Sequence, residues 1–227
     1  MKQMHILGIG NSYMDDSLWN IVPLLKDKYD DIDIAIIYYG GCSIDAHLDN
    51  LNNGRSIYEI HRNTGNGWNI EYNKSIYDAI KLDNWNHILF IQGTGDGISD
   101  HGYIDSYHNL STLVDRIKKL NNDDNTKYYL IESWPDKDGN MRDYETKRHK
   151  TSKQMFMSIE NVINKYIIPN NIVDDVIPVG KMIQNLKEKV DYNLLYRDSN
   201  HLSLDIGRDK ASSTVLNIIE NSNNTKK

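Results

Sequence analysis

The sequence predicts a three-layer α/β/α fold in which helices cover both faces of a five-stranded parallel sheet. Apolar runs without helical spacing alternate with segments that have it, and 227 residues at 39% hydrophobic content suffice for one sizeable core. Parallel neighbours need crossover connections, and a crossover helix buries its apolar side on the sheet. We expect the flavodoxin-like strand order 2-1-3-4-5 in a single domain over residues 1–220, with a flexible polar tail at 221–227.

The strand and helix segments follow one another in a regular order. Strands are expected at 5–9, 32–39, 87–91, 127–131 and 173–179, and helices near 18–29, 75–82, 103–120, 145–166, 180–190 and 204–220. One segment departs from this order, because Trp68, Ile70 and Tyr72 alternate with polar residues after a turn that contains Gly65 and Gly67. Glycine supplies the positive φ of a tight turn, so a β-hairpin insertion is predicted near 57–72.

Charge, cysteine content and hydropathy exclude several classes of protein. The formal net charge is −6, and Lys and Arg are scattered among Asp and Glu, so a nucleic-acid partner is not expected. A single cysteine, Cys42, rules out an intramolecular disulfide and fits a reducing compartment. Neither a signal-peptide pattern nor an 18-residue apolar run is present, so no membrane partner is expected. The chain is expected in the cytoplasm, with a mature secreted form and the oligomeric state left open.

Three short segments place reactive side chains or uncovered backbone near predicted strand or helix ends. Ser12 follows the apolar, glycine-ended run 6–10 at a strand-to-helix turn, where ligands bind in open α/β sheets. Gly41 follows the second strand and leaves its backbone open to close approach. Asp198 and His201 are three residues apart, so one segment can supply a general base and the carboxylate that holds its tautomer.

Each of these segments also has a purely structural interpretation. Asn11 or Ser12 can cap the following helix, and Ser43 can cap a helix after a tight turn. Asp198 or Ser203 can cap the last helix from a surface loop. Taken singly, the segments do not decide between capping and catalysis.

Taken in chain order, the segments resemble the sequence blocks of the SGNH hydrolases, or GDSL-type esterases. The blocks are Gly10-Asn11-Ser12, Gly41, Gln92-Gly93-Thr94-Gly95-Asp96 and Asp198-x-x-His201, and they span nearly the whole chain. The resemblance implies that Ser12 is the nucleophile, His201 the base and Asp198 the residue that orients His201. It also implies that the N–H groups of Ser12 and Gly41 belong to an oxyanion hole.

Two positions depart from the family pattern. Asn11 stands where the first block usually has aspartate, and Gly95 stands where the third block usually has an asparagine that donates to the oxyanion. Gln92 is expected to replace that donor, since glutamine followed by glycine at this strand end is similar to carbohydrate acetylesterase branches. The chain thus resembles a poorly characterised SGNH-like branch related to those enzymes.

These features predict a serine esterase that hydrolyses a short-acyl ester, with acetyl esters of carbohydrates favoured by the resemblance. Tyr13 and Trp134 are candidates to line the substrate. No cofactor or metal is implied, because the eight histidines show neither His-Glu-x-x-His nor paired cysteine ligands. An inactive SGNH-like fold serving as a carbohydrate-binding or structural module is the alternative. A nucleotide-binding module, suggested by the two glycines of 8–10, is disfavoured because position 13 is tyrosine.

Overall fold

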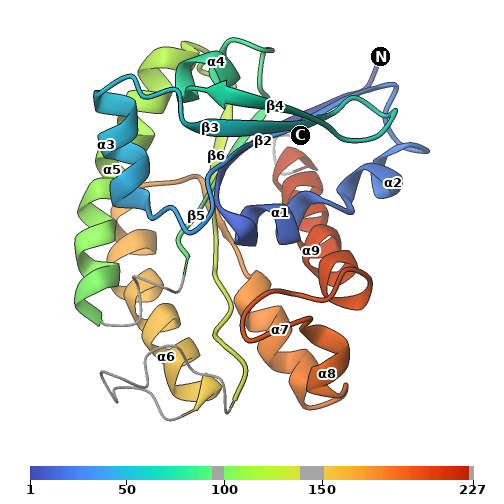
Figure 1. The fold of residues 1–227 in the computed structure, drawn as a ribbon, viewed down its shortest axis with the longest axis vertical. Coiled ribbons are helices and arrows are strands. Elements are labelled where there is room, and N and C mark those ends of the chain that lie inside the picture. Colours follow the sequence, from blue (N-terminus) through green and yellow to red (C-terminus); the bar gives the residue numbers. More distant parts are fainter. Residues whose placement is uncertain (94–99, 139–150, 225–227) are drawn as a thin grey trace.

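A computed structural model describes residues 1–93, 100–138 and 151–224. Its centre is a mixed seven-stranded sheet with the order β4-β3-β2-β1-β5-β6-β7. Figure 1 shows helices on both sides of the strands. The strands are β1 Gln3–Gly10, β2 Asp31–Tyr38, β3 Tyr58–Asn63, β4 Asn69–Lys74, β5 His87–Ile91, β6 Lys127–Ile131 and β7 Asp175–Ile177.

The prediction of a five-stranded parallel sheet is wrong. The parallel strands β2, β1, β5, β6 and β7 lie in the predicted order, but β3 pairs antiparallel with β2, and β4 pairs antiparallel with β3. The predicted hairpin therefore extends the sheet. The open edge of β2 offers unpaired N–H and C=O groups, and β3 satisfies them while burying Tyr58 and Ile60. Asn63 Oδ1 closes the turn by accepting from the N–H groups of Gly65 and Gly67, whose φ angles are +100° and +105°.

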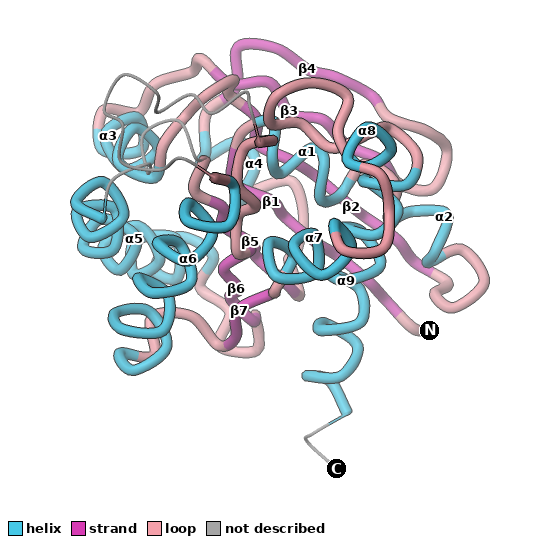
Figure 2. The backbone as a smooth tube through the Cα atoms, turned by 90° about the horizontal axis from the view of Figure 1, so that it is seen from below, coloured by secondary structure: helices cyan, strands magenta, loops and turns pink. Residues whose placement is uncertain are grey.

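Helices cover both faces of the sheet, so the predicted three layers are present. Figure 2 shows the two sets on opposite sides of the strands. One face carries α1 Ser12–Leu18, α2 Ile21–Leu25, α7 Val179–Lys187, α8 Tyr192–Leu195 and α9 Ile206–Asn224. The other carries α3 Ile44–Asn52, α4 Ile76–Ile80, α5 Asp100–Asn121 and α6 Ser152–Val162, which continues into a π-helical turn at Ile163–Ile167 and a 3₁₀ turn at Ile168–Asn170.

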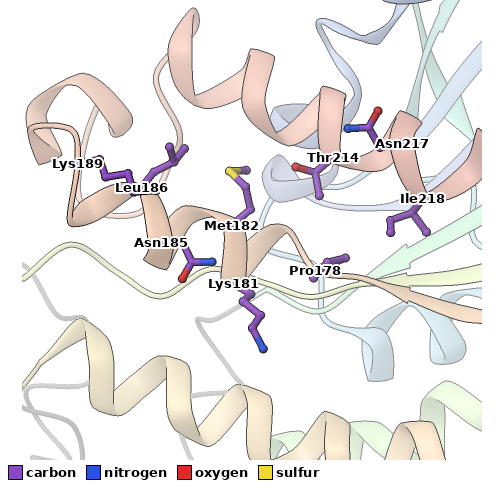
Figure 3. Close-up of a pocket in the computed structure, with 9 residues that line it drawn as sticks. All are labelled: Pro178, Lys181, Met182, Asn185, Leu186, Lys189, Thr214, Asn217 and Ile218. Carbon is purple, nitrogen blue, oxygen red and sulfur yellow. The ribbon is translucent and has the colours of Figure 1, made fainter. Parts of the chain in front are cut away.

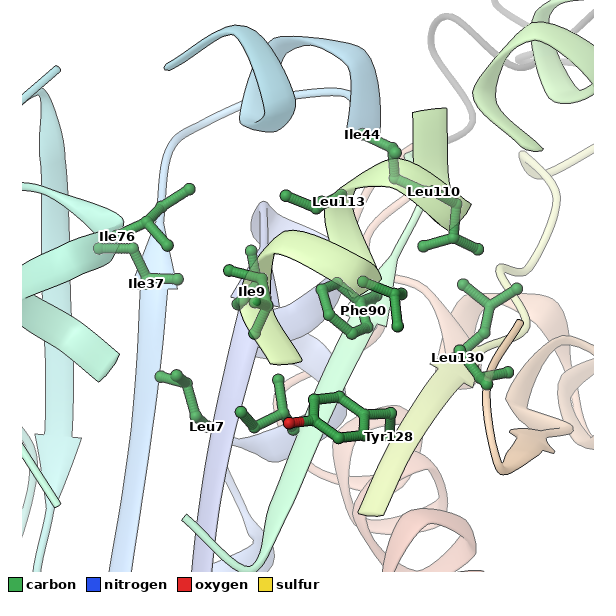
Figure 4. Packing of buried hydrophobic residues seen from close by; sticks show 14 of the residues in the cluster. Leu7, Ile9, Ile37, Ile44, Ile76, Phe90, Leu110, Leu113, Tyr128 and Leu130 are labelled. Carbon is green, nitrogen blue, oxygen red and sulfur yellow. The ribbon is translucent and has the colours of Figure 1, made fainter. Parts of the chain in front are cut away.

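The apolar runs of the central strands supply both halves of the core. Figure 4 shows Ile9 and Phe90 on the sheet packing with Leu110 and Leu113 of α5. Ile6 and Ile91 belong to the second apolar cluster, beneath α1 and α9. Alternate residues of a strand point to opposite faces, which explains why these runs are apolar throughout. Among the described residues, no helix has both the length and the apolar composition needed to cross a bilayer.

Some helix boundaries differ from those predicted. The helix expected at 18–29 is two helices and begins at Ser12. Helix α3 was absent from the expected helices, although the structural interpretation of Ser43 as a cap is confirmed, since its Oγ accepts from Ala46 N. Helix α6 begins at Ser152, and residues 145–150 of the helix expected at 145–166 lie outside the described residues. Helix α9 extends to Asn224.

A buried carboxyl follows β6 and caps α7. Glu132 Oε2 accepts from Lys181 N at 2.7 Å, and the Glu132 side chain is otherwise enclosed. Burial raises the pKa of Glu132 from 4.5 to about 7. The negative charge of nearby Glu160 adds to this rise, and the hydrogen bond from the Lys181 N–H acts to lower the pKa. Between about pH 4.5 and 7 the folded protein therefore binds a proton that the unfolded chain has lost. This carboxyl favours folding at the acid end of that window and opposes it as the pH rises.

We expect Glu132→Gln to become progressively more stable than the wild type as the pH increases. The difference in free energy of unfolding between the two should grow by about 2 to 3 kcal/mol between pH 5 and 8, at ~1.4 kcal/mol per pKa unit. Urea denaturation at several pH values measures it, with exposed Glu188→Gln as the control for a lost surface charge. A pH-independent difference for Glu132→Gln would contradict the raised pKa.

Candidate functional site

Ser12 lies at the carboxyl end of β1, as the first residue of α1. Asn11 is the helix cap, since its Oδ1 accepts from Tyr13 N at 3.0 Å. This leaves the Ser12 hydroxyl free of a capping role. Gly10 allows α1 to start so close to the sheet, because a Cβ at that position would lie 2.7 Å from Met14 Cβ on α1.

His201 and Asp198 lie beside Ser12 on the loop before α9. His201 Nε2 is 2.8 Å from Ser12 Oγ, and His201 Nδ1 is 2.7 Å from Asp198 Oδ2. Asp198 Oδ1 also accepts from the backbone N–H groups of His201 and Asn200, at 2.8 and 2.9 Å. Partial burial acts to raise the pKa of Asp198, but these hydrogen bonds and the imidazole hold it below its ordinary value of 3.8. The carboxylate is therefore charged at neutral pH, as an orienting partner for imidazole requires.

A buried aspartate that the sequence analysis missed ties this loop to the helix of Ser12. Asp16 is fully buried on α1 and accepts from Leu202 N at 2.9 Å. Arg197 and Arg208 also donate to Asp16, at 2.7 and 2.8 Å. The residue after His201 is thus fixed directly to α1. No local sequence signal reveals this contact, because its partners lie some 180 residues away along the chain.

The loop after β2 brings Gly41 to the same edge of the sheet. Asn11 Nδ2 donates to Cys42 O at 2.8 Å, which fixes this loop against the start of α1. Gly41 has a φ of +69° and is exposed, and a Cβ there would meet no atom within 4 Å. Its backbone is therefore open to a ligand.

Gln92 lies at the end of β5, which neighbours β1 as the predicted strand order requires. Its Oε1 accepts from Ile44 N at 2.8 Å, so the side chain holds the start of α3. Its Nε2 is buried and has no hydrogen-bond partner among the described residues. Thr94, Gly95 and Asp96 of the third sequence block lie outside the described residues.

The two aromatic residues suggested to line the substrate are buried. Trp134 is 0% exposed and Tyr13 is 2% exposed, and their rings stack with centroids 4.5 Å apart. Trp134 Nε1 donates to Asn200 O at 2.8 Å, and the Tyr13 ring centroid is 6.3 Å from that of His201. In this structure the pair supports the histidine loop from within, and neither ring is open to solvent.

A second histidine lies between two carboxylates on the same face of the sheet. His61 Nδ1 is 3.0 Å from Asp15 Oδ1, and His61 Nε2 is 2.9 Å from Glu59 Oε2. Burial acts to lower the pKa of His61, but the two carboxylates outweigh it and raise that pKa above 6.5. Because both ring nitrogens are engaged by carboxylates, His61 links β3 to α1 and is not free to accept a proton from a hydroxyl.

A separate groove of about 330 Å³ lies between α7 and α9 (Figure 3). Met182 and Leu186 form part of its apolar lining, and Lys181 and Lys189 also line it. It shares no residue with the Ser12, His201 and Asp198 group. Among the described residues, no cluster of three or more His, Cys, Asp or Glu side chains could hold a metal ion.

Solved structures with similar folds include several hydrolases. A DUF4886 family protein from Bacteroides uniformis matches with a TM-score of 0.83 and 24% identity, over 94% of this chain and 81% of that one. A member of the lipolytic G-D-S-L family from Veillonella parvula matches with a TM-score of 0.57 and 14% identity, over 96% and 98% of the two chains. A catalytic mutant of an acetylxylan esterase from Geobacillus stearothermophilus matches with a TM-score of 0.57 and 12% identity, over 96% and 94%.

These likenesses confirm the predicted resemblance at the level of fold, so the chain has the SGNH-like α/β fold. The chain belongs to the family described as "Domain of unknown function (DUF4886)", whose model matches residues 5–226. No curated protein matches the chain.

Proposed function

We propose that this protein is a serine esterase with Ser12 as nucleophile, His201 as general base and Asp198 as the orienting carboxylate. The observation that carries the proposal is the continuous chain of contacts from Ser12 Oγ through both His201 nitrogens to Asp198, at 2.8 and 2.7 Å. Nucleophile and base within hydrogen-bond reach, with the base held by a third group, is the arrangement that activates a weak nucleophile.

The reaction proceeds in two steps on these residues. Ser12 Oγ attacks the ester carbonyl while its proton passes to His201 Nε2, and that proton then goes to the leaving alcohol. Water repeats the sequence on the acyl-enzyme and releases the acid. Asp198 keeps the Nδ1–H tautomer and stabilises the imidazolium that forms between proton transfers.

The N–H groups of Ser12 and Gly41 are proposed to stabilise the oxyanion, together with Gln92 Nε2. Ser12 is the first residue of α1, so its N–H has no partner within the helix. Gly41 offers an uncovered backbone, and the Gln92 amide is a buried donor without a described partner. Fixed donors aimed at developing charge in a water-poor site contribute much of the catalysis in acyl transfer.

An acetyl ester of a carbohydrate is the proposed substrate class. Two observations support it: an acetylxylan esterase shares the fold, and Tyr39, beside the Gly41 loop, has an aromatic side chain that is 43% exposed. Aromatic faces suit sugar rings because they offer a flat apolar surface with a polar end. The alternative, an inactive carbohydrate-binding or structural module, predicts sugar binding without turnover.

A serine-directed phosphonate tests the proposal. We expect it to label the wild type at one site, mapped by peptide mass spectrometry to Ser12, and to leave Ser12→Ala unlabelled. A panel of acetylated sugars and longer acyl esters then identifies the acyl preference. An unlabelled wild type that binds sugars and hydrolyses no ester would favour the inactive module.

A further inference from the structure

The side-chain amide of Asn200 lies beside the nitrogen that carries the proton. Asn200 Nδ2 is 3.4 Å from His201 Nε2, the atom that also lies 2.8 Å from Ser12 Oγ. Asn200 is 7% exposed, so its amide is almost removed from solvent.

Three contacts fix Asn200 in this orientation. Its backbone N–H donates to Asp198 Oδ1 at 2.9 Å, and its backbone oxygen accepts from Trp134 Nε1 at 2.8 Å. Its side-chain Oδ1 accepts from Ser199 Oγ at 2.9 Å. With backbone and Oδ1 engaged, the Nδ2 group is directed at the edge of the imidazole.

In the resting site this amide donor makes only a long contact with His201 Nε2. The distance of 3.4 Å to His201 Nε2 exceeds that of a good N–H hydrogen bond, and the single lone pair of Nε2 already faces the Ser12 hydroxyl. An oxygen that approaches Nε2 to take its proton would come within reach of Asn200 Nδ2. During ester cleavage, the leaving-group oxygen is that atom.

We propose that Asn200 donates a hydrogen bond from Nδ2 to the leaving-group oxygen while His201 protonates it. The C–O bond of the tetrahedral intermediate breaks, its electron pair goes to the leaving oxygen, and the proton moves to that oxygen from Nε2. Asn200 keeps its own protons and stabilises the charge that develops during the transfer. This inference rests on the proposed esterase mechanism.

A donor at this position matters most for esters whose alcohols leave poorly. Alkyl and sugar alkoxides are strongly basic and leave only with a proton and hydrogen bonds to stabilise them, whereas a nitrophenolate delocalises its charge and leaves unaided. Loss of the Asn200 donor should therefore slow alkyl acetates by about ten- to a hundredfold while p-nitrophenyl acetate changes much less.

The experiment compares wild type, Asn200→Ala and Asn200→Asp on acetate esters whose leaving alcohols span a wide range of pKa. Rates are normalised to active sites titrated with a serine-directed phosphonate, so that misfolded protein does not count. We expect kcat/KM to depend more steeply on leaving-group pKa in both variants, because both lack the amide donor and Asn200→Asp retains the side-chain shape. Trp134→Phe is the matched control, because it removes the contact to Asn200 O and should lower all rates by a similar factor.

Equal losses for alkyl and aryl acetates in the Asn200 variants would overturn the inference and leave Asn200 as a positioning residue for the loop. Unchanged rates would overturn it as well. If the wild type hydrolysed no ester, or if Ser12→Ala kept its activity, the proposed esterase function itself would fail, and the inference with it. The Ser12→Ala result thus separates failure of the inference from failure of the mechanism.

Discussion

Ser12→Ala and His201→Ala are each expected to lower kcat by about four to six orders of magnitude, with KM changed far less. The reason is the 2.8 Å contact between Ser12 Oγ and His201 Nε2, which joins the proposed nucleophile and the proposed base into one unit. Combining the two substitutions should cost little more than either alone, since residues that act as a unit are strongly non-additive. Steady-state hydrolysis of an acetyl ester, with thermal denaturation to verify folding, measures all three variants.

Control variants come from the same chain. Ser17 lies on α1 and bonds to Tyr13 O, and exposed His108 lies on α5, so Ser17→Ala and His108→Ala should keep most of the activity. Substantial turnover in Ser12→Ala would sink the mechanism. Independent, additive losses for Ser12→Ala and His201→Ala would show that the two side chains do not act together.

The parallel part of the sheet could be predicted because each of its strands is recognised from residues that are adjacent in the sequence. The apolar runs 5–9 and 87–91 end at Gly10 and Gln92, and crossover rules limit how such strands can be ordered. The position of the hairpin could not be predicted in this way. Its alternation and its Gly65 turn look the same whether β3 is solvent-exposed or pairs with β2, and only the free edge of β2 decides between them.

The candidate site likewise has one part that can be predicted from the sequence and another part that depends on tertiary contacts. Asp198 and His201 are three residues apart, so their pairing is readable from the chain, and the contact with Ser12 follows from where the strands and loops end. The support by Asp16 depends on two arginines that tertiary folding brings in. Tyr13 next to Ser12 suggested a substrate-lining ring, but helical geometry turns that residue inward onto Trp134.

Gln92 has two proposed roles, one as an anchor for α3 and one as a donor to the oxyanion. Its Oε1 accepts from Ile44 N and so holds the start of α3, while its Nε2 is buried without a described partner. Leaving a buried amide donor unpaired costs about 1–3 kcal/mol, which is a reason to expect that Nε2 gains a partner when an oxyanion forms. Anchoring of α3 and the proposed donation to the oxyanion thus belong to two different atoms of one side chain.

Gln92→Glu and Gln92→Ala separate these functions. Gln92→Glu keeps an oxygen for Ile44 N and removes the amide donor, whereas Gln92→Ala removes both. If Nε2 serves the oxyanion, both variants should lose roughly 10²–10³ in kcat, with a smaller change in KM, and only Gln92→Ala should also lose the Ile44 contact. Turnover per phosphonate-titrated site and melting temperature are measured together. A destabilised but fully active Gln92→Ala would remove Gln92 from the chemistry, leaving the oxyanion to the N–H groups of Ser12 and Gly41, because a donor that acts only in the transition state cannot be lost without slowing turnover.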